Sequence, residues 1–115
     1  MTAIIVRSPA VAEGIASVAA GSRVETFPGG DPSLALGWLA ERSRERPVRV
    51  LFYEPSFLPD PAPFRSMSPH TVLVAVYSPS ETEGARDAVR CGVAAVLAKP
   101  FTAEDVRGVY ALASR

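Results

Sequence analysis

Short apolar runs that alternate with segments of helical periodicity constrain the fold of this 115-residue chain more than any other feature. Most of the runs are rich in β-branched residues, which is typical of strands buried on both faces of a sheet. They cover Ala3–Val6, Arg23–Phe27, Val48–Tyr53, Thr71–Tyr77 and Ala94–Ala98. Because parallel strands are joined by right-handed crossovers, the alternation predicts an α/β fold: a doubly wound, five-stranded parallel sheet with helices on both faces.

Helix-start signals follow the first two predicted strands. Ser8 and Pro9 supply an N-cap and a first-turn proline, and Gly21 ends this helix. Asp31 and Pro32 open a second helix, which closes through a polar stretch. The residues expected on the core side are Val11, Ile15 and Val18 in the first helix, and Leu34, Trp38 and Leu39 in the second.

The last two helices carry comparable signals. Ser80–Glu83 has the pattern of a capping box, and Gly92 is the expected C-cap of the same helix. Thr102 caps the final helix. The residues expected to face the core are Ala85, Ala88 and Val89 in the first of these helices, and Val106, Val109, Tyr110 and Ala113 in the second.

A proline-rich segment separates the third and fourth predicted strands. Its prolines are Pro55, Pro59, Pro61, Pro63 and Pro69. Proline in a helix interior costs about 3 kcal/mol. We therefore expect the helix here to be shortened or replaced by a loop, with at most a turn around Phe64–Ser68. Apolar cover for the sheet is expected from Phe57, Leu58, Phe64 and Met67.

Composition limits the classes of function. Twelve basic and twelve acidic residues give a net charge of zero, without the excess positive field that nucleic-acid binding needs. One cysteine, Cys91, and one histidine, His70, argue against a disulfide framework and a Cys/His metal cluster. No apolar stretch reaches about 18 residues, so no membrane span is expected. These features predict a single cytoplasmic domain over residues 1–115, without metal or cofactor.

The end of the chain resembles a known family. Gly92 lies seven residues before Lys99-Pro100-Phe101, with a strand just before this motif and Thr102 as a helix cap after it. This combination resembles the end of a response-regulator receiver (CheY-like) domain of two-component systems, and the order of elements matches over nearly the whole chain. The resemblance implies a receiver/flavodoxin-like fold. It also implies that Lys99 reaches a phosphoryl group as a point charge, with a cis peptide bond before Pro100.

The metal and phosphoacceptor positions depart from the family's pattern. A working receiver needs an acidic pair just after the first strand to hold Mg²⁺. Arg7 and Ser8 stand there instead. The phosphoacceptor aspartate should end the third strand, where this chain has Glu54 or, in a register shifted by one residue, Pro55. The resemblance is therefore to a receiver whose acidic pocket is degenerate.

The two switch positions are also altered. The Ser/Thr expected at the end of the fourth strand falls on Tyr77 or Ser78, depending on a one-residue choice of alignment. Val96 replaces the aromatic residue expected three positions before the lysine. Together with the missing acids, this resembles a pseudo-receiver.

Arg7, Glu54 and Lys99 are expected to meet at the carboxyl edge of the sheet, where open α/β folds place their sites. One hypothesis is that a fixed cluster of these residues locks a single conformation, with Glu54 as a constitutive negative charge. The alternative is a plain, partly exposed ion pair that contributes about 0–1 kcal/mol and has no signalling role.

Three functions follow from these observations. The first is a non-catalytic signalling module that binds a signalling protein or a fused output domain without phosphorylation. Its binding face would comprise the fourth helix, the fifth strand and the last helix (Val106–Ala113, with Arg86, Arg90 and Arg107), and a homodimer through the last helix is an option. The second is an atypical phosphoacceptor that uses Glu54, Asp60 or Asp31. The third is a small-ligand domain with a pocket around Arg7, Ser8, Glu54 and Ser78.

Overall fold

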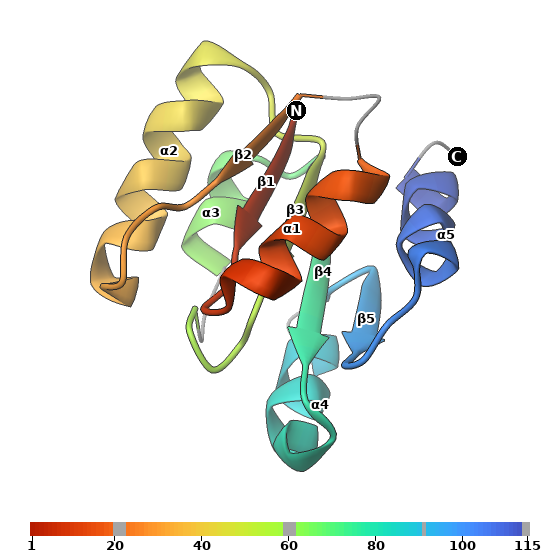
Figure 1. The fold of residues 1–115 in the computed structure, drawn as a ribbon. Coiled ribbons are helices and arrows are strands. Elements are labelled where there is room, and N and C mark those ends of the chain that lie inside the picture. Colours follow the sequence, from red (N-terminus) through yellow and green to blue (C-terminus); the bar gives the residue numbers. More distant parts are fainter. Residues whose placement is uncertain (20–22, 59–61, 91, 114–115) are drawn as a thin grey trace.

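The computed structural model describes residues 1–19, 23–58, 62–90 and 92–113. Five parallel strands form one sheet in the order β2-β1-β3-β4-β5 (Figure 1). The strands are β1 (Thr2–Ile5), β2 (Val24–Thr26), β3 (Val50–Tyr53), β4 (Val72–Tyr77) and β5 (Ala95–Ala98). Each begins and ends within two residues of its predicted range, and the predicted doubly wound sheet is confirmed. The predictions for Gly21, Asp60 and Cys91 lie outside the described residues.

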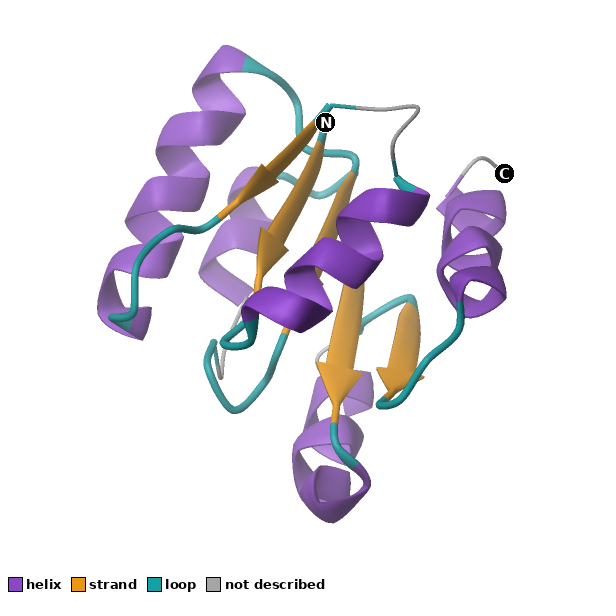
Figure 2. Ribbon diagram, viewed as in Figure 1, coloured by secondary structure: helices purple, strands orange, loops and turns teal. Residues whose placement is uncertain are grey.

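Helices cover both faces of the sheet (Figure 2). They are α1 (Pro9–Val18), α2 (Ala35–Glu45), α3 (Ala62–Met67), α4 (Thr82–Arg90) and α5 (Ala103–Ala113). Two 3₁₀ turns, η1 (Pro32–Leu34) and η2 (Pro79–Glu81), lead into α2 and α4. Helices α1 and α5 pack on one face, and α2, α3 and α4 supply the apolar core on the other.

The central strands β1 and β3 are buried along their whole length. Alternate residues point to opposite faces, so Leu51 and Tyr53 join the core beneath α2 and α3, whereas Val50 and Phe52 join the core beneath α1 and α5. A buried side chain of this size contributes about 1.5–3 kcal/mol to stability. Burial on both faces is thus confirmed for β1 and β3, whereas the edge strands β2 and β5 are only partly buried.

The proline-rich segment forms a short helix, α3, so the predicted shortening is confirmed, whereas the expectation of at most a turn around Phe64–Ser68 was wrong in extent. Pro63 is the second residue of α3, where a missing N–H costs no helical hydrogen bond. Phe64 is fully buried and its carbonyl accepts from the amide of Ser68 at 2.9 Å. Phe57 and Leu58 are buried as expected. The side chains of Met67 and Ala85 lie outside the described part of the chain.

Two residues predicted for the core lie on the surface instead. Leu34 is 61% exposed because it is the last residue of η1 and does not lie on the apolar face of α2. Ala35 and Leu39 form that face. Val89 is 60% exposed because Ala88 faces the sheet, and consecutive helical residues lie about 100° apart. Val106 and Val109 are buried in α5, as predicted.

Thr102 caps α5 as predicted, and Asp31 caps η1, the 3₁₀ turn that leads into α2. Ser8 takes the N-cap position of α1 without a side-chain hydrogen bond, and the capping box at α4 is displaced. Glu81 Oε1 accepts from the amide of Ser78 at 3.3 Å, so the capping box is Ser78–Glu81 rather than Ser80–Glu83. The shift follows from η2, which starts the helical path at Pro79. Gly92 ends α4 with a φ of 85°, a conformation that favours glycine. No helix in the described ranges is both long and apolar enough to cross a membrane.

Candidate functional site

The carboxylate of Glu54 is the centre of the site at the carboxyl edge of the sheet. Glu54 directly follows β3 and is only 4% exposed. Its Oε2 accepts a hydrogen bond from Lys99 Nζ at 2.7 Å, and its Oε1 accepts from the backbone N–H of Arg7 at 2.8 Å. Arg7 follows β1 and Lys99 follows β5, so the parallel topology brings three distant segments together.

The Arg7 side chain takes a different course from the one predicted. Its guanidinium lies 5.9 Å from the centre of the Phe57 ring and donates to the Ser56 carbonyl at 3.4 Å. Within the described ranges, no ion pair joins this guanidinium to Glu54. The three residues therefore meet as predicted, but the Arg7 charge takes no part: Glu54 pairs with the Lys99 ammonium, and Arg7 contributes its backbone amide.

The Glu54–Lys99 ion pair is more than a surface contact. The Glu54 side chain is 5% exposed and the Lys99 side chain 22% exposed. A carboxylate withdrawn from water in this way needs a compensating charge and hydrogen bonds, and both of its oxygens have them. The figure of about 0–1 kcal/mol for an exposed pair consequently does not apply to this one.

Glu81 is a second carboxylate at this edge. From the sequence it was expected only as part of a helix-capping segment. A hydrogen bond from the Ser78 side chain, assisted by Ser56 and by the charge of Lys99, lowers the pKa of Glu81 although partial burial opposes the shift. The Ser-x-x-Glu pattern at Ser78–Glu81 was the signal that could have found it. Among the described residues, this edge therefore brings together the carboxylates of Glu54 and Glu81 and the ammonium group of Lys99.

The predicted switch positions lie in different surroundings. Ser78 follows β4 and lies beside Lys99, whereas the Tyr77 carbonyl accepts from the amide of Lys99 at 2.8 Å. Val96 of β5 lies opposite Ala75 of β4. It is 38% exposed and faces α4 rather than the site. Ser8 is the N-cap residue of α1, but its side chain makes no capping hydrogen bond.

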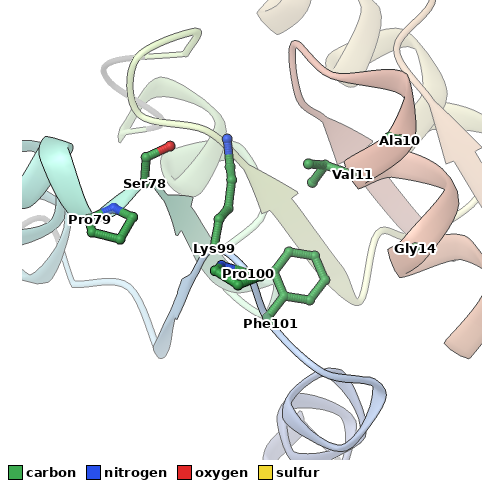
Figure 3. A pocket seen from close by; sticks show the side chains of 8 residues that line it. All are labelled: Ala10, Val11, Gly14, Ser78, Pro79, Lys99, Pro100 and Phe101. Carbon is green, nitrogen blue, oxygen red and sulfur yellow. The ribbon is translucent and has the colours of Figure 1, made fainter.

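A groove of about 480 Å³ opens beside Lys99 (Figure 3). Its lining residues are Ala10, Val11, Gly14, Ser78, Pro79, Lys99, Pro100 and Phe101. Of the residues expected around a ligand pocket, only Ser78 lines this groove. Its walls are mostly apolar, since Val11 approaches it from α1 and Phe101 from the segment after β5. The Lys99–Pro100 peptide bond is cis, as the resemblance implied.

The residues at this edge do not fit Mg²⁺. Arg7 and Ser8, which follow β1 at this edge, carry no carboxylate, and the Lys99 ammonium already occupies Oε2 of Glu54. In the described ranges, no group of three or more His, Cys, Asp or Glu side chains is placed to hold a metal ion.

Comparisons with known proteins agree with this architecture. No protein-family model and no curated protein sequence matches the chain. Among solved structures, the receiver domain of NtrX from Brucella abortus has a TM-score of 0.77 at 18% identity, with 98% of this chain and 97% of that chain covered. The receiver domain of AraT from Geobacillus stearothermophilus has a TM-score of 0.74 at 26% identity, covering 97% and 91%.

A CheY-like protein (TadZ) from Pseudomonas aeruginosa is similar over 98% of this chain and 99% of that chain, with a TM-score of 0.73 at 15% identity. All three similarities extend over nearly the whole length of both partners. The sheet order, the cis Lys99–Pro100 bond and these similarities agree. This chain therefore has the fold of the CheY-like receiver domains of response regulators.

Proposed function

We propose that this chain is a signalling module of the receiver type that works without phosphorylation and without enzymatic activity. One observation carries the proposal: both oxygens of the buried Glu54 carboxylate are engaged, one by Lys99 Nζ and the other by the amide of Arg7. Glu54 then supplies a permanent negative charge, and Lys99 is held by it continuously. The module rests in one state that does not depend on a phosphodonor.

The same geometry opposes phosphoryl transfer to Glu54. The attacking oxygen would have to leave its hydrogen bond, and the phosphoryl charge would have to be neutralised at an edge whose residues do not fit Mg²⁺. Arg7 is no substitute, since its guanidinium is directed to Ser56 and Phe57. These contacts favour a module held permanently in one state over one in which Glu54 serves as an atypical phosphoacceptor.

The output of such a module is binding of a partner through α4, β5 and α5. Exposed apolar side chains occur on all three elements: Val89 on α4, Val96 on β5 and Leu112 on α5. Arg86 and Arg90 are exposed on α4 beside them. The partner is another signalling protein, an output domain on the same chain or a second copy.

Incubation with acetyl phosphate and Mg²⁺, followed by intact-protein mass spectrometry, tests the proposal. We expect no phosphoryl adduct on this chain. A variant with Arg7→Asp, Ser8→Asp and Glu54→Asp restores the acidic pair and the acceptor, and serves as the matched control. An adduct on the unaltered chain that maps to an acidic residue of this edge would overturn the proposal.

A further inference from the structure

The two edges of the sheet are protected very differently. At the β2 edge, the central residue Glu25 pairs with Arg23 at 3.4 Å and with Arg42 of α2 at 3.8 Å. A short, charged strand of this kind resists pairing with another chain. The β5 edge is four residues of Ala, Val and Leu, with neither a charge nor a proline. The β5 edge is therefore the one open to a further strand.

Hydrogen-bonding groups of β5 face outward at alternate residues. The amide of Lys99 donates toward β4, to the Tyr77 carbonyl at 2.8 Å. Since backbone groups alternate along a strand, Leu97 faces β4 as well, and the N–H and C=O groups of Val96 and Ala98 point away from the sheet. Both residues are exposed. They form a short template for a sixth strand.

A groove of about 350 Å³ runs beside this edge, between α4 and β5. Val89 and Val96 supply its apolar lining, and Arg86 and Arg90 supply its charged lining. Arg90 has one ion pair, to Asp87 at 3.7 Å, and both side chains are largely exposed, so that pair stabilises little. The groove thus joins an apolar depression to two positive charges.

We propose that the β5 edge and this groove together bind an extended segment of a partner protein. Main-chain hydrogen bonds to Val96 and Ala98 would align the segment as a sixth strand, and an apolar side chain would enter the groove. Carboxylates two residues before and after it, on the same face of the strand, would face Arg86 and Arg90. The inference rests on the proposed function, because it names the chemistry of the partner bound at that face.

Charge complementarity favours such an acidic segment over a second copy of the chain. Two copies paired antiparallel and edge to edge through β5 would place both α4 helices on the same face of a continuous sheet. Arg86 and Arg90 of one copy would then lie beside the same arginines of the other, and like charges at such a junction repel. An acidic segment meets the opposite charge at the same positions.

Titration of the ¹⁵N-labelled chain with the capped peptide Thr-Glu-Thr-Val-Thr-Glu-Thr, whose valine and glutamates share one face of an extended strand, tests this inference. We expect saturable shifts and slower hydrogen exchange at the amides of Val96 and Ala98. The same peptide with Lys in place of Glu, or with alternate amides N-methylated on the pairing side, should produce neither effect. Equal binding of the Lys peptide, or shifts confined to other surfaces, would overturn the inference.

Matched variants test whether the groove between α4 and β5 is the binding site of the peptide. Arg86→Glu with Arg90→Glu should weaken binding at least about tenfold, equivalent to about 1.4 kcal/mol, whereas Arg44→Glu on α2 should not. Val89→Ala should weaken binding and Leu34→Ala should not, although the two side chains are equally exposed.

Protection of Val96 in a dimer formed without peptide would instead make a second copy the occupant. None of these outcomes bears on the acetyl phosphate test, so failure here is distinguishable from failure of the proposed function.

Discussion

Glutamate rather than aspartate at the end of β3 lets one side chain reach two partners. Glu54 carries its carboxylate one methylene further from the backbone than aspartate does, and it spans from the Arg7 amide to Lys99 Nζ. The charge of Lys99 is thereby compensated by a residue of the protein itself.

Substitution Glu54→Gln keeps the size of this side chain and removes its charge. The Lys99 ammonium then loses its ion-pair partner in a partly buried position, and we expect the free energy of unfolding to fall by about 2–3 kcal/mol. Urea denaturation measures the change. Glu41→Gln, on the exposed side of α2, is the control and should change stability by less than about 0.5 kcal/mol. An equally small effect at Glu54 would show that the pair is only a surface contact.

Substitution Arg7→Ala distinguishes the observed arrangement from a three-membered ionic cluster. The guanidinium contacts the Phe57 ring and the Ser56 carbonyl, and its loss should cost about 0.5–1 kcal/mol. The bond to Glu54 persists because it comes from the backbone of residue 7. Urea denaturation again measures the change in the free energy of unfolding. A loss as large as that of Glu54→Gln would contradict this arrangement and point to a direct charge contact between Arg7 and Glu54.

The lowered pKa of Glu81 gives stability a dependence on pH. Because this pKa is lower in the folded state, the carboxylate stabilises the fold above its ordinary value of about 4.5, and the contribution is lost as pH falls through the lowered pKa. Unfolding of the parent and of Glu81→Gln, followed from about pH 6 to about pH 3, should show a difference that shrinks with acidification. A constant difference would mean that the carboxyl does not titrate in this way.

Among the elements, the strands were the most predictable from the sequence and the caps of α4 the least. Strands buried on both faces leave a run of apolar residues that few other structures produce. At α4 two overlapping Ser-x-x-Glu-like patterns, Ser78–Glu81 and Ser80–Glu83, compete, and only the 3₁₀ turn at Pro79 decides between them. The spacing of apolar residues in α4 likewise did not determine whether Val89 faces the sheet or the solvent.

The capping box of α5 offers a prediction at the scale of an element. Thr102 Oγ1 accepts from the amide of Asp105 at 3.2 Å, and Asp105 Oδ2 accepts from the amide of Thr102 at 2.9 Å. Thr102→Ala should therefore cost about 1 kcal/mol in the free energy of unfolding, and Thr102→Ser should restore most of it. Chemical denaturation of the three proteins provides the comparison. Equal stability of the Ala and Ser variants would contradict the role of the hydroxyl.

At the scale of the whole molecule, the alternation of strands and helices was enough to predict the architecture. Its radius of gyration is 12.7 Å, close to the value of about 13 Å expected for a compact domain of this length. The meeting of Arg7, Glu54 and Lys99 followed from parallel topology alone. The direction of the Arg7 side chain and the inclusion of Glu81 did not, because both depend on loops whose paths no periodicity records.

The most direct test of the central claim is a set of amide NMR spectra with Mg²⁺ and then with Mg²⁺ plus beryllofluoride, a mimic of aspartyl phosphate. We expect resonances near Glu54, Ser78 and Lys99 to stay in place, because the Glu54 carboxylate and the Lys99 ammonium already neutralise one another. The triple variant with Arg7→Asp, Ser8→Asp and Glu54→Asp shows how a restored acidic site responds. Saturable shifts of those resonances in the unaltered chain would contradict a receiver fold locked by its own ion pair.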